Sequence, residues 1–238
     1  MFRERIRSKD FKQMPPEYQE LLSRVLTIQA DCEIGGPRIY CERWLLRAPT
    51  VEDMYRLARI VSEDLDHFRK INRLLKEIHI DGTYLLQKEN SERYLDAFKI
   101  GQLPTWSELA VFYFLVARVG KYQMEEFLDS TYLPLVEIAP GIINEEMSHA
   151  AYGHTKMREL CSNGKGRVEI QQALERWYPL ALDMFGRSES RRSERYLEWG
   201  LKLRTNAEAR RAYMEDVLPL IAELGLDVPD ERTNRKYL

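Results

Sequence analysis

The sequence has little of what membrane proteins and secreted proteins require. Its longest apolar run, Leu109 to Val119, contains Arg118 and is too short to cross a bilayer. The N-terminal sequence MFRERIRSKDFKQM lacks the apolar stretch of a signal peptide. The cysteines are Cys32, Cys41 and Cys161. Their number is odd, and they do not have the spacing of a metal site. We therefore expect a cytoplasmic protein with reduced thiols and no membrane partner.

The chain also lacks a charge excess and the motifs of redox cofactors. Its formal net charge is −2, which gives no global field that would collect nucleic acid, and we expect no nucleic-acid partner. It has no flavin, nicotinamide or iron–sulfur motif. Any electrons that this protein uses must therefore come from another protein.

Apolar residues recur at helical spacing over four long stretches. The predicted helices span residues 17–46, 50–78, 105–128 and 131–161. Thr50 followed by Asp53, and Thr105 followed by Glu108, resemble the capping boxes that begin helices. No stretch alternates in the manner of a β-strand. The sequence therefore predicts an all-α fold.

A polar connection of about 25 residues, His79 to Pro104, separates the second and third predicted helices. Two helical hairpins joined by one long crossover are the connectivity of ferritin-like four-helix bundles. At this length we expect a single domain, residues 1–238. It would comprise a core bundle at 17–161, further helices at 167–224 and a polar tail at 227–238.

Two of the predicted helices carry a carboxylate three residues before a histidine. Asp64 and His67 form the pair in the second helix, and Glu146 and His149 form the pair in the fourth. Residues three apart share a helix face, so both side chains of a pair can contact one ion. Both pairs continue an apolar stripe and should point into the core, where an unpaired carboxylate is costly. This pattern is typical of carboxylate-bridged di-iron sites.

Ligands from different helices can bind the same metal site only if they lie at the same level along the axis of the bundle. Asp64 is 15 residues after Pro49, and Glu33 is 16 residues before it. Both are therefore roughly 23 Å from this turn at about 1.5 Å per residue, which makes Glu33 the candidate from the first helix. The same count, made from the turn between the third and fourth predicted helices, places the partner of Glu146 near residues 114–117. That stretch reads Phe-Leu-Val-Ala and contains no carboxylate.

Simpler explanations exist for these residues. A single carboxylate–histidine pair on a helix is more often a surface pair, whereas two pairs on apolar faces at matched heights favour a metal site. His79 and His154 lack such support, and a role for His154 in orienting a ligand is the minor alternative. Gly35-Gly36-Pro37 follows Glu33 and predicts either a functional distortion of the first helix or a plain kink.

Segments outside the ligand pairs carry a family resemblance. They read RWLLRAP at 43–49, GKY at 120–122, RWYPLALDMFG at 176–186, LKLRTN at 201–206 and LGLDVP at 224–229, besides EDLDH at 63–67 and EEMSH at 145–149. Together they resemble the catalytic subunits of bacterial phenylacetyl-CoA epoxidase, with benzoyl-CoA epoxidase as a more distant relative. The similarity runs from about Ile28 to Pro229. The C-terminal segments are the more specific part, because unrelated di-iron bundles share the ligands without that tail.

The resemblance implies a ferritin-like fold with a non-haem di-iron centre. Such a centre activates dioxygen and inserts one oxygen atom into the aromatic ring of a CoA thioester, with electrons from a separate reductase. The implied ligands are Glu33, Asp64, His67, Glu146 and His149. Asp64 stands where the family has glutamate, and Ala117 stands where it has aspartate. Three outcomes stay open: two metals completed by solvent, a single iron or other divalent metal, or an empty site as in the family's non-catalytic partner subunit.

The resemblance also implies a homo- or hetero-oligomer with a reductase and a related helical subunit. Basic residues between Arg187 and Arg211 could bind the phosphates of CoA, although a solvated basic face is the simpler explanation for any one of them. We therefore expect an oxygenase component for an aromatic or related acyl-CoA, without catalytic residues beyond the metal ligands. The alternative is a structural or regulatory subunit of such a complex. Ferritin-like metal storage is less favoured because of the similarity of the tail.

Overall fold

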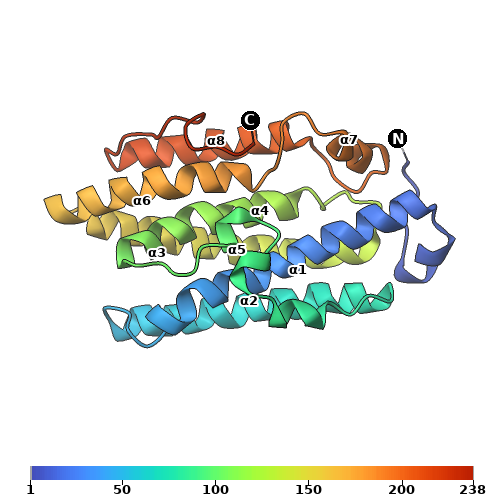
Figure 1. The fold of residues 1–238 in the computed structure, drawn as a ribbon, viewed down its shortest axis with the longest axis horizontal. Helices are drawn as coiled ribbons and strands as arrows, with labels where there is room; N and C mark the ends of the chain where they lie inside the picture. The colour runs from blue at the N-terminus through green and yellow to red at the C-terminus, as the bar shows by residue number, and fades with distance from the viewer. Residues whose placement is uncertain (1, 238) are drawn as a thin grey trace. The chain divides into compact units, whose positions relative to one another are not determined.

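The computed structural model describes residues 2–237, and the regular secondary structure within them is helical. The α-helices of the described residues are α1 (Pro16–Trp44), α2 (Val51–Glu77), α3 (Trp106–Phe112), α4 (Arg118–Glu125), α5 (Leu133–Leu160), α6 (Gly164–Asp183), α7 (Arg191–Glu198) and α8 (Asn206–Glu223) (Figure 1). The described residues form no β-sheet, and a single bridge joins Ile6 to Tyr132. The all-α prediction is confirmed. No helix in the described part of the chain is both long enough and apolar enough to span a membrane.

The predicted helix starts coincide with capped helix ends. The Thr50 side chain accepts a hydrogen bond from the Asp53 amide at 3.1 Å and begins α2. The Thr105 side chain accepts one from the Glu108 amide at 3.0 Å and begins α3. These bonds satisfy amide groups that have no partner inside the helix. The capping pattern in the sequence therefore located both starts.

The chain folds into two compact units. Unit 1 consists of the chain up to Gln102, Phe127–Pro140 and Arg195–Leu203, and unit 2 consists of Leu103–Glu126, Gly141–Glu194 and the chain from Arg204 onward. Helix α5 contributes its beginning to unit 1 and the rest to unit 2. The single domain that the chain length suggests therefore stays a prediction.

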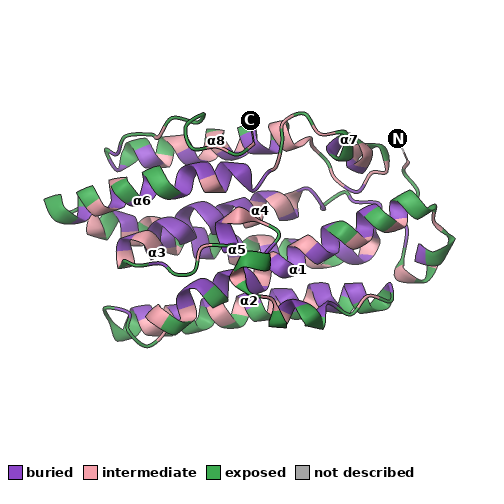
Figure 2. Ribbon diagram, in the orientation of Figure 1, coloured by how far each residue is buried: buried purple, intermediate pink, exposed green. Residues whose placement is uncertain are grey.

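In unit 1, helices α1 and α2 lie side by side and run in opposite directions (Figure 1). Each turns an apolar stripe toward the interior, so buried and exposed residues alternate along both helices (Figure 2). The stripe of α2 includes Leu57, Ile60 and Ile71, all of which are fully buried. This pairing positions the ligand candidates of unit 1.

The long crossover between α2 and α3 is fixed to α1 by a buried ion pair. It contains three short 3-10 helices, η2 (Gly82–Gln87), η3 (Asn90–Glu92) and η4 (Asp96–Phe98). The Arg93 guanidinium donates to the Asp31 carboxylate at 2.8 Å, and neither side chain is exposed. The Tyr94 amide donates to the other oxygen of Asp31 at 2.9 Å. The crossover is therefore an ordered layer on α1 and not a free loop.

In unit 2, the third predicted helix is split into α3, η5 (Tyr113–Ala117) and α4. The η5 segment is a π-helix. Helix α6 packs on α3, where the rings of Phe112 and Trp177 lie 5.1 Å apart. Helix α8 packs on α4, where Arg118 binds the Asp216 carboxylate at 2.7 Å. The C-terminal helices thus cover the helix that contains Ala117.

The structure shows a π-helix in the third helical stretch and a continuous α1. Helix α1 continues through Gly35-Gly36-Pro37, and the π-helix occurs at Tyr113–Ala117. A Cβ atom at Gly35 would lie 2.9 Å from the Phe98 ring of η4, so this glycine provides room for the crossover. A functional distortion or a plain kink after Glu33 therefore stays a prediction, while Gly35 serves the close packing of the crossover.

The C-terminal residues are bound to the end of α6. The Arg235 guanidinium donates to the Asp183 carboxylate at 2.6 Å, and the Lys236 amide donates to its other oxygen at 2.7 Å. Both the Arg235 and the Asp183 side chains are nearly buried. These contacts lie within unit 2 and hold the polar end of the chain in place.

Candidate metal centre

Glu33 and His67 meet between the two helices of unit 1. The Glu33 carboxylate lies 3.2 Å from Nδ1 of His67. The His67 side chain is fully buried and that of Glu33 is 9% exposed. Both residues project from opposite helices of the α1–α2 pair at the same level, as the matched distances from the Pro49 turn require.

Asp64 completes a three-residue group in unit 1. Glu33, Asp64 and His67 each offer one ligand atom, and these atoms all lie within 4.8 Å of one another. The Tyr40 hydroxyl donates to the Asp64 carboxylate at 2.7 Å. Burial and the negative charge of Asp64 together raise the pKa of the nearby Cys41 thiol to about 11. Two carboxylates and an imidazole in a buried site are a donor set that iron accepts.

Pro37 affects the backbone at Glu33. It lies inside α1, four residues after Glu33, and proline has no amide hydrogen. The Glu33 carbonyl therefore cannot accept the usual helical hydrogen bond from position 37. Helix α1 is consequently less tightly bonded at the residue that offers its carboxylate to the group.

Glu146 and His149 form a second buried pair, in the part of α5 that belongs to unit 2. The Glu146 carboxylate lies 3.8 Å from Nδ1 of His149. His149 is almost completely buried and Glu146 is 7% exposed. The spacing of three residues puts both side chains on one face of α5, as the sequence predicted.

Two small residues of unit 2, Ala117 and Gly120, lie one helical turn apart. Ala117 ends the π-helix and is buried, so no carboxylate is available at the position where the family resemblance expects one. A Cβ atom at Gly120, one turn later, would lie 3.1 Å from both Cδ and Oε2 of Glu146. The absence of a side chain at Gly120 therefore leaves the space that the Glu146 carboxylate occupies.

The variant Gly120→Ala should keep the fold and weaken metal binding. Alanine favours the helix by about 0.5–1 kcal/mol over glycine, but its methyl group would displace the Glu146 carboxylate. We expect about tenfold or greater loss of metal affinity with little change in unfolding free energy, measured by metal titration and urea denaturation. Gly141→Ala on α5, whose Cβ atom would meet nothing within 4 Å, is the matched control. Unchanged affinity in Gly120→Ala would contradict this role.

The other two histidines of the chain are His79 and His154. His79 is exposed and has a positive φ of 67° just after α2. The His154 ring stacks on the Phe114 ring at 5.5 Å within unit 2. Burial lowers the pKa of His154, and the charge of Arg158 lowers it further.

His154 should make the protein less stable in acid. Because its folded-state pKa lies below the ordinary histidine value, the unfolded chain binds the proton more readily. The stability from neutral His154 is present above pH of about 6.5 and is lost as the pH falls toward the lowered value. We expect His154→Phe to reduce the slope of unfolding free energy against pH, measured by urea denaturation, while His79→Gln leaves it unchanged. An equal slope in both variants would exclude His154 as the source.

The basic residues suggested for CoA phosphates are partly committed to structural contacts. In unit 1, Arg195 donates to the Glu17 carboxylate at 2.6 Å. In unit 2, Arg204 donates to Glu126 at 2.6 Å, and the nearly buried Arg210 donates to the carbonyl of Leu182. These arginines hold helices together, so the structure does not single them out as a phosphate site.

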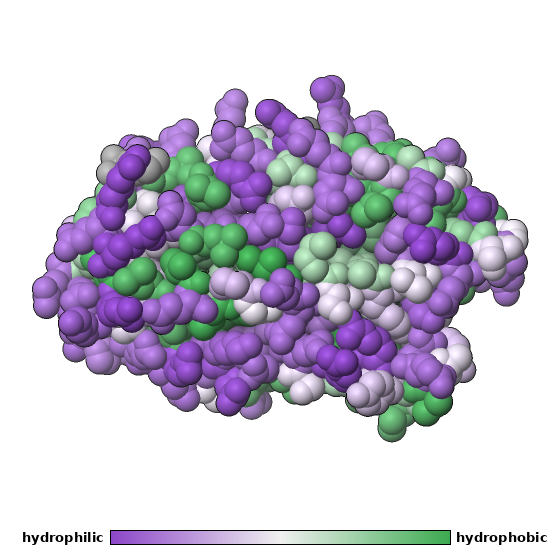
Figure 3. Space-filling model, turned by 180° about the vertical axis from the view of Figure 1, so that it is seen from behind, coloured by the Kyte–Doolittle hydropathy of each residue, from purple (hydrophilic) through white to green (hydrophobic). Residues whose placement is uncertain are grey.

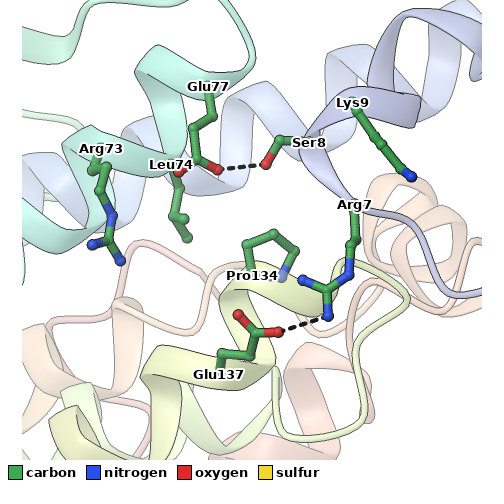
Figure 4. Close-up of a pocket in the computed structure, with 8 residues that line it drawn as sticks. All are labelled: Arg7, Ser8, Lys9, Arg73, Leu74, Glu77, Pro134 and Glu137. Atoms are coloured by element: carbon green, nitrogen blue, oxygen red, sulfur yellow. Dashed lines mark hydrogen bonds and ion pairs between the residues drawn. The ribbon is translucent and has the colours of Figure 1, made fainter.

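Unit 1 also contains a cleft of about 270 Å³ that none of the three residues lines. Arg7, Lys9 and Arg73 line it together with two glutamates (Figure 4). Glu137 binds Arg7 at 3.1 Å, and Glu77 accepts a hydrogen bond from Ser8 (Figure 4). Its carboxylates are thus engaged with neighbouring side chains, and no histidine or cysteine lines it. It offers no comparable set of metal ligands.

Comparison with known proteins decides the family. The model of the family described as "Phenylacetic acid catabolic protein" matches residues 6–237. The chain belongs to this family. The ferritin-like, all-α fold class predicted from the sequence is thereby confirmed, as is the resemblance carried by the C-terminal segments.

Two curated proteins that are similar to this phenylacetic acid catabolic protein are an epoxidase subunit and an oxygenase component. One subunit of 1,2-phenylacetyl-CoA epoxidase from Escherichia coli (strain K12) is 27% identical over 223 residues, which cover 91% of this chain and 71% of the relative. Benzoyl-CoA oxygenase component B from Aromatoleum evansii is 25% identical over 228 residues, covering 83% of this chain and 48% of the relative. The alignment thus spans about half of the second protein.

Sequence reasoning missed two residues that surround the candidate ligands. Tyr40 lies seven residues, or two turns, after Glu33, so helical periodicity places both on one face of α1. That spacing could have identified it. Gly120 belongs to a recognised segment, but nothing in the sequence indicates that it faces Glu146. Its role becomes visible only from the packing of α4 on α5.

Proposed function

We propose that this chain is the oxygenase component of a multicomponent enzyme that acts on an aromatic or related acyl-CoA thioester. The observation that carries the proposal is the group of Glu33 with the buried Asp64 and His67, whose ligand atoms lie within 4.8 Å of one another. Family membership and the two oxygenase relatives support the same reaction class. Electrons would come from a separate reductase, and we propose a cytoplasmic hetero-oligomer with a related helical subunit.

The proposed cofactor is iron, with two ions per chain if the site is complete. The proposed ligands are Glu33, Asp64 and His67 from unit 1 together with Glu146 and His149 from unit 2. Their chemistry fits, because buried carboxylates and imidazoles need a partner of opposite charge or a metal to offset desolvation. Bound iron would supply the activation of dioxygen.

The residues of this chain would orient the ligands and exclude water. Tyr40 holds one oxygen of Asp64 by its hydroxyl and so fixes the direction of that carboxylate. Gly120 keeps space for the carboxylate of Glu146. The apolar stripes of α1 and α2 surround the group in unit 1, and a water-poor site strengthens the attraction between ligands and metal.

A second candidate function rests on Ala117. The lack of a carboxylate at this buried position favours a structural or regulatory subunit that keeps the helical fold without a complete metal site. The two buried histidines argue against it, since a scaffold gains nothing from burying a polar ring without a ligand. We therefore place the oxygenase component first.

Reconstitution tests the proposed function. The protein is assayed with a panel of aromatic acyl-CoA thioesters, iron, an electron-donating reductase and dioxygen, and oxygenated product is measured by mass spectrometry. We expect turnover that requires both metal and reductase and falls by at least about 100-fold in the variant His67→Ala/His149→Ala. The exposed His79→Ala is the control. Full activity of the reconstituted complex with the double variant would exclude the oxygenase role and leave the scaffold.

A further inference from the structure

Helix α8 places a polar hydroxyl group against the π-helix of unit 2. Hydrophilic residues make up most of the face drawn in Figure 3, with hydrophobic patches among them. Tyr213 of α8, in contrast, is fully buried. Its hydroxyl donates to the backbone carbonyl of Leu115 at 3.3 Å. Because Leu115 lies within the π-helix Tyr113–Ala117, a side chain of the C-terminal helix bonds directly to the backbone of the distorted segment.

The Leu115 carbonyl lies close to the point where the π-helix returns to α-helix. It accepts the amide of Arg118, which is only three residues later, whereas a carbonyl in a regular α-helix accepts the amide four residues later. Hydrogen bonds across three residues have poorer geometry. A carbonyl oxygen has two lone pairs, so it can accept a second donor at the same time. The Tyr213 hydroxyl supplies that donor from another helix.

Neighbouring aromatic rings fix the orientation of the Tyr213 side chain. The Tyr122 ring of α4 meets it edge-on with 5.9 Å between the centroids, and the Phe185 ring lies 5.4 Å away. Burial raises the pKa of Tyr213 well above its ordinary value, so the hydroxyl stays protonated and can donate. A buried hydroxyl without a partner would be costly. Packing and hydrogen bonding therefore favour the same position of this side chain.

Two further contacts hold the segment around the π-helix. Asp216, one turn after Tyr213 on α8, binds Arg118 at 2.7 Å. A Cβ atom at Gly153 of α5 would lie 2.9 Å from the Cα atom of Phe114, so α5 also approaches the backbone of the π-helix closely. Of these contacts, the bond from Tyr213 is the one that a substitution can remove without a change in the size of the ring.

We propose that Tyr213 is a positioning residue for the Glu146 carboxylate and acts through the π-helix. This inference rests on the proposed role of Glu146 as a metal ligand. Gly120 leaves the space that the Glu146 carboxylate occupies, and it lies three residues after Ala117, where the π-helix ends. The place of Gly120 beside Glu146 therefore depends on the backbone of the π-helix. Without the Tyr213 hydroxyl, the Leu115 carbonyl loses a donor and this backbone is held less firmly.

The variant Tyr213→Phe tests the inference because it removes the hydroxyl and keeps the ring. Anaerobic titration of the full chain with Fe²⁺, without substrate or reductase, measures the metal affinity. We expect at least about tenfold weaker binding, while circular dichroism shows a folded helical protein. Tyr18→Phe is the matched control, because Tyr18 is also fully buried and its hydroxyl bonds to Thr131 at 3.2 Å. It lies 15 residues before Glu33 on α1, or roughly 22 Å along the helix, and should leave the affinity unchanged.

Hydrogen exchange of the metal-free protein tests the link through the π-helix. In Tyr213→Phe, the amides of residues 113–120 should exchange about fivefold faster than in the wild-type protein, because one hydrogen bond to this backbone is lost. The amides of α2 in unit 1 should exchange at the wild-type rate. Tyr18→Phe should leave exchange in residues 113–120 unchanged.

These measurements separate a positioning role from an ordinary structural bond. Unchanged metal affinity in Tyr213→Phe, an equal loss in Tyr18→Phe, or weaker binding without faster exchange in residues 113–120 would overturn the inference. The proposed function fails on a different result, which is a wild-type protein that binds metal but yields no oxygenated product in the reconstituted system. A wild-type protein that binds no Fe²⁺ would overturn both.

Discussion

Protein purified from iron-replete cells should carry about two metal ions per chain, and His149→Ala should carry far less. The reason is that Glu146 and His149 share one buried face of α5, so removing the imidazole deprives the site of a neutral nitrogen ligand. Elemental analysis of both proteins measures the effect, and His79→Ala controls for the loss of an exposed histidine. Loss of a ligand typically costs metal affinity by at least about 10–100-fold.

The number of metal ions per chain also shows how the absence of a carboxylate at Ala117 affects the site. About two ions in the wild-type protein would mean that solvent replaces the missing carboxylate. About one ion, rising to two in Ala117→Asp, would mean that the second metal lacks only this ligand. Negligible metal in wild type, His149→Ala and Ala117→Asp alike would contradict the metal centre and leave the scaffold function.

The variant Gly153→Ala should be strongly destabilised. A Cβ atom at this position of α5 would lie 2.7 Å from the carbonyl oxygen of Ala110 and closer still to the amide nitrogen of Phe114. Both are backbone atoms that cannot rotate away, so the helices α3 and α5 must separate. We expect a loss of about 1–3 kcal/mol or more in the free energy of unfolding, measured by urea denaturation.

The control for this variant lies on the same helix. Gly141→Ala would meet nothing within 4 Å and should gain about 0.5–1 kcal/mol from reduced chain entropy. Opposite signs for the two changes would show that contact with the π-helix, and not helix propensity, makes Gly153 necessary. If Gly153→Ala proved as stable as Gly141→Ala, the close approach of the helices would be refuted.

Local signals accounted for the parts of the fold that the sequence predicted. Thr50 and Thr105 begin helices because their side chains bond to amides three residues later, a relation visible without tertiary structure. Asp64 and His67 could be placed on an inward face because helical periodicity depends on the apolar pattern alone. The level of Glu33 followed from counting residues about one turn.

Contacts between distant segments could not be predicted in this way. Asp31 and Arg93 are 62 residues apart, and neither position has a local pattern that indicates its partner. The contact of Gly120 with Glu146 depends on how closely α4 approaches α5. The π-helix was also unforeseen, since Tyr113–Ala117 is uniformly apolar and resembles any buried helix.

The π-helix fixes the angular register of everything that follows it in the third helical stretch. A π-turn holds one residue more than an α-turn, so it behaves as a single-residue insertion whose surplus is absorbed over Tyr113–Ala117. Deleting one residue there would allow regular α-helix and would rotate α4 by about 100° about its axis. Gly120 would then turn away from Glu146, and Arg118 would turn away from Asp216. Chain length at this point is therefore as constrained as residue identity, and homologous chains that keep the contact of Gly120 with Glu146 should not tolerate a deletion within Tyr113–Ala117.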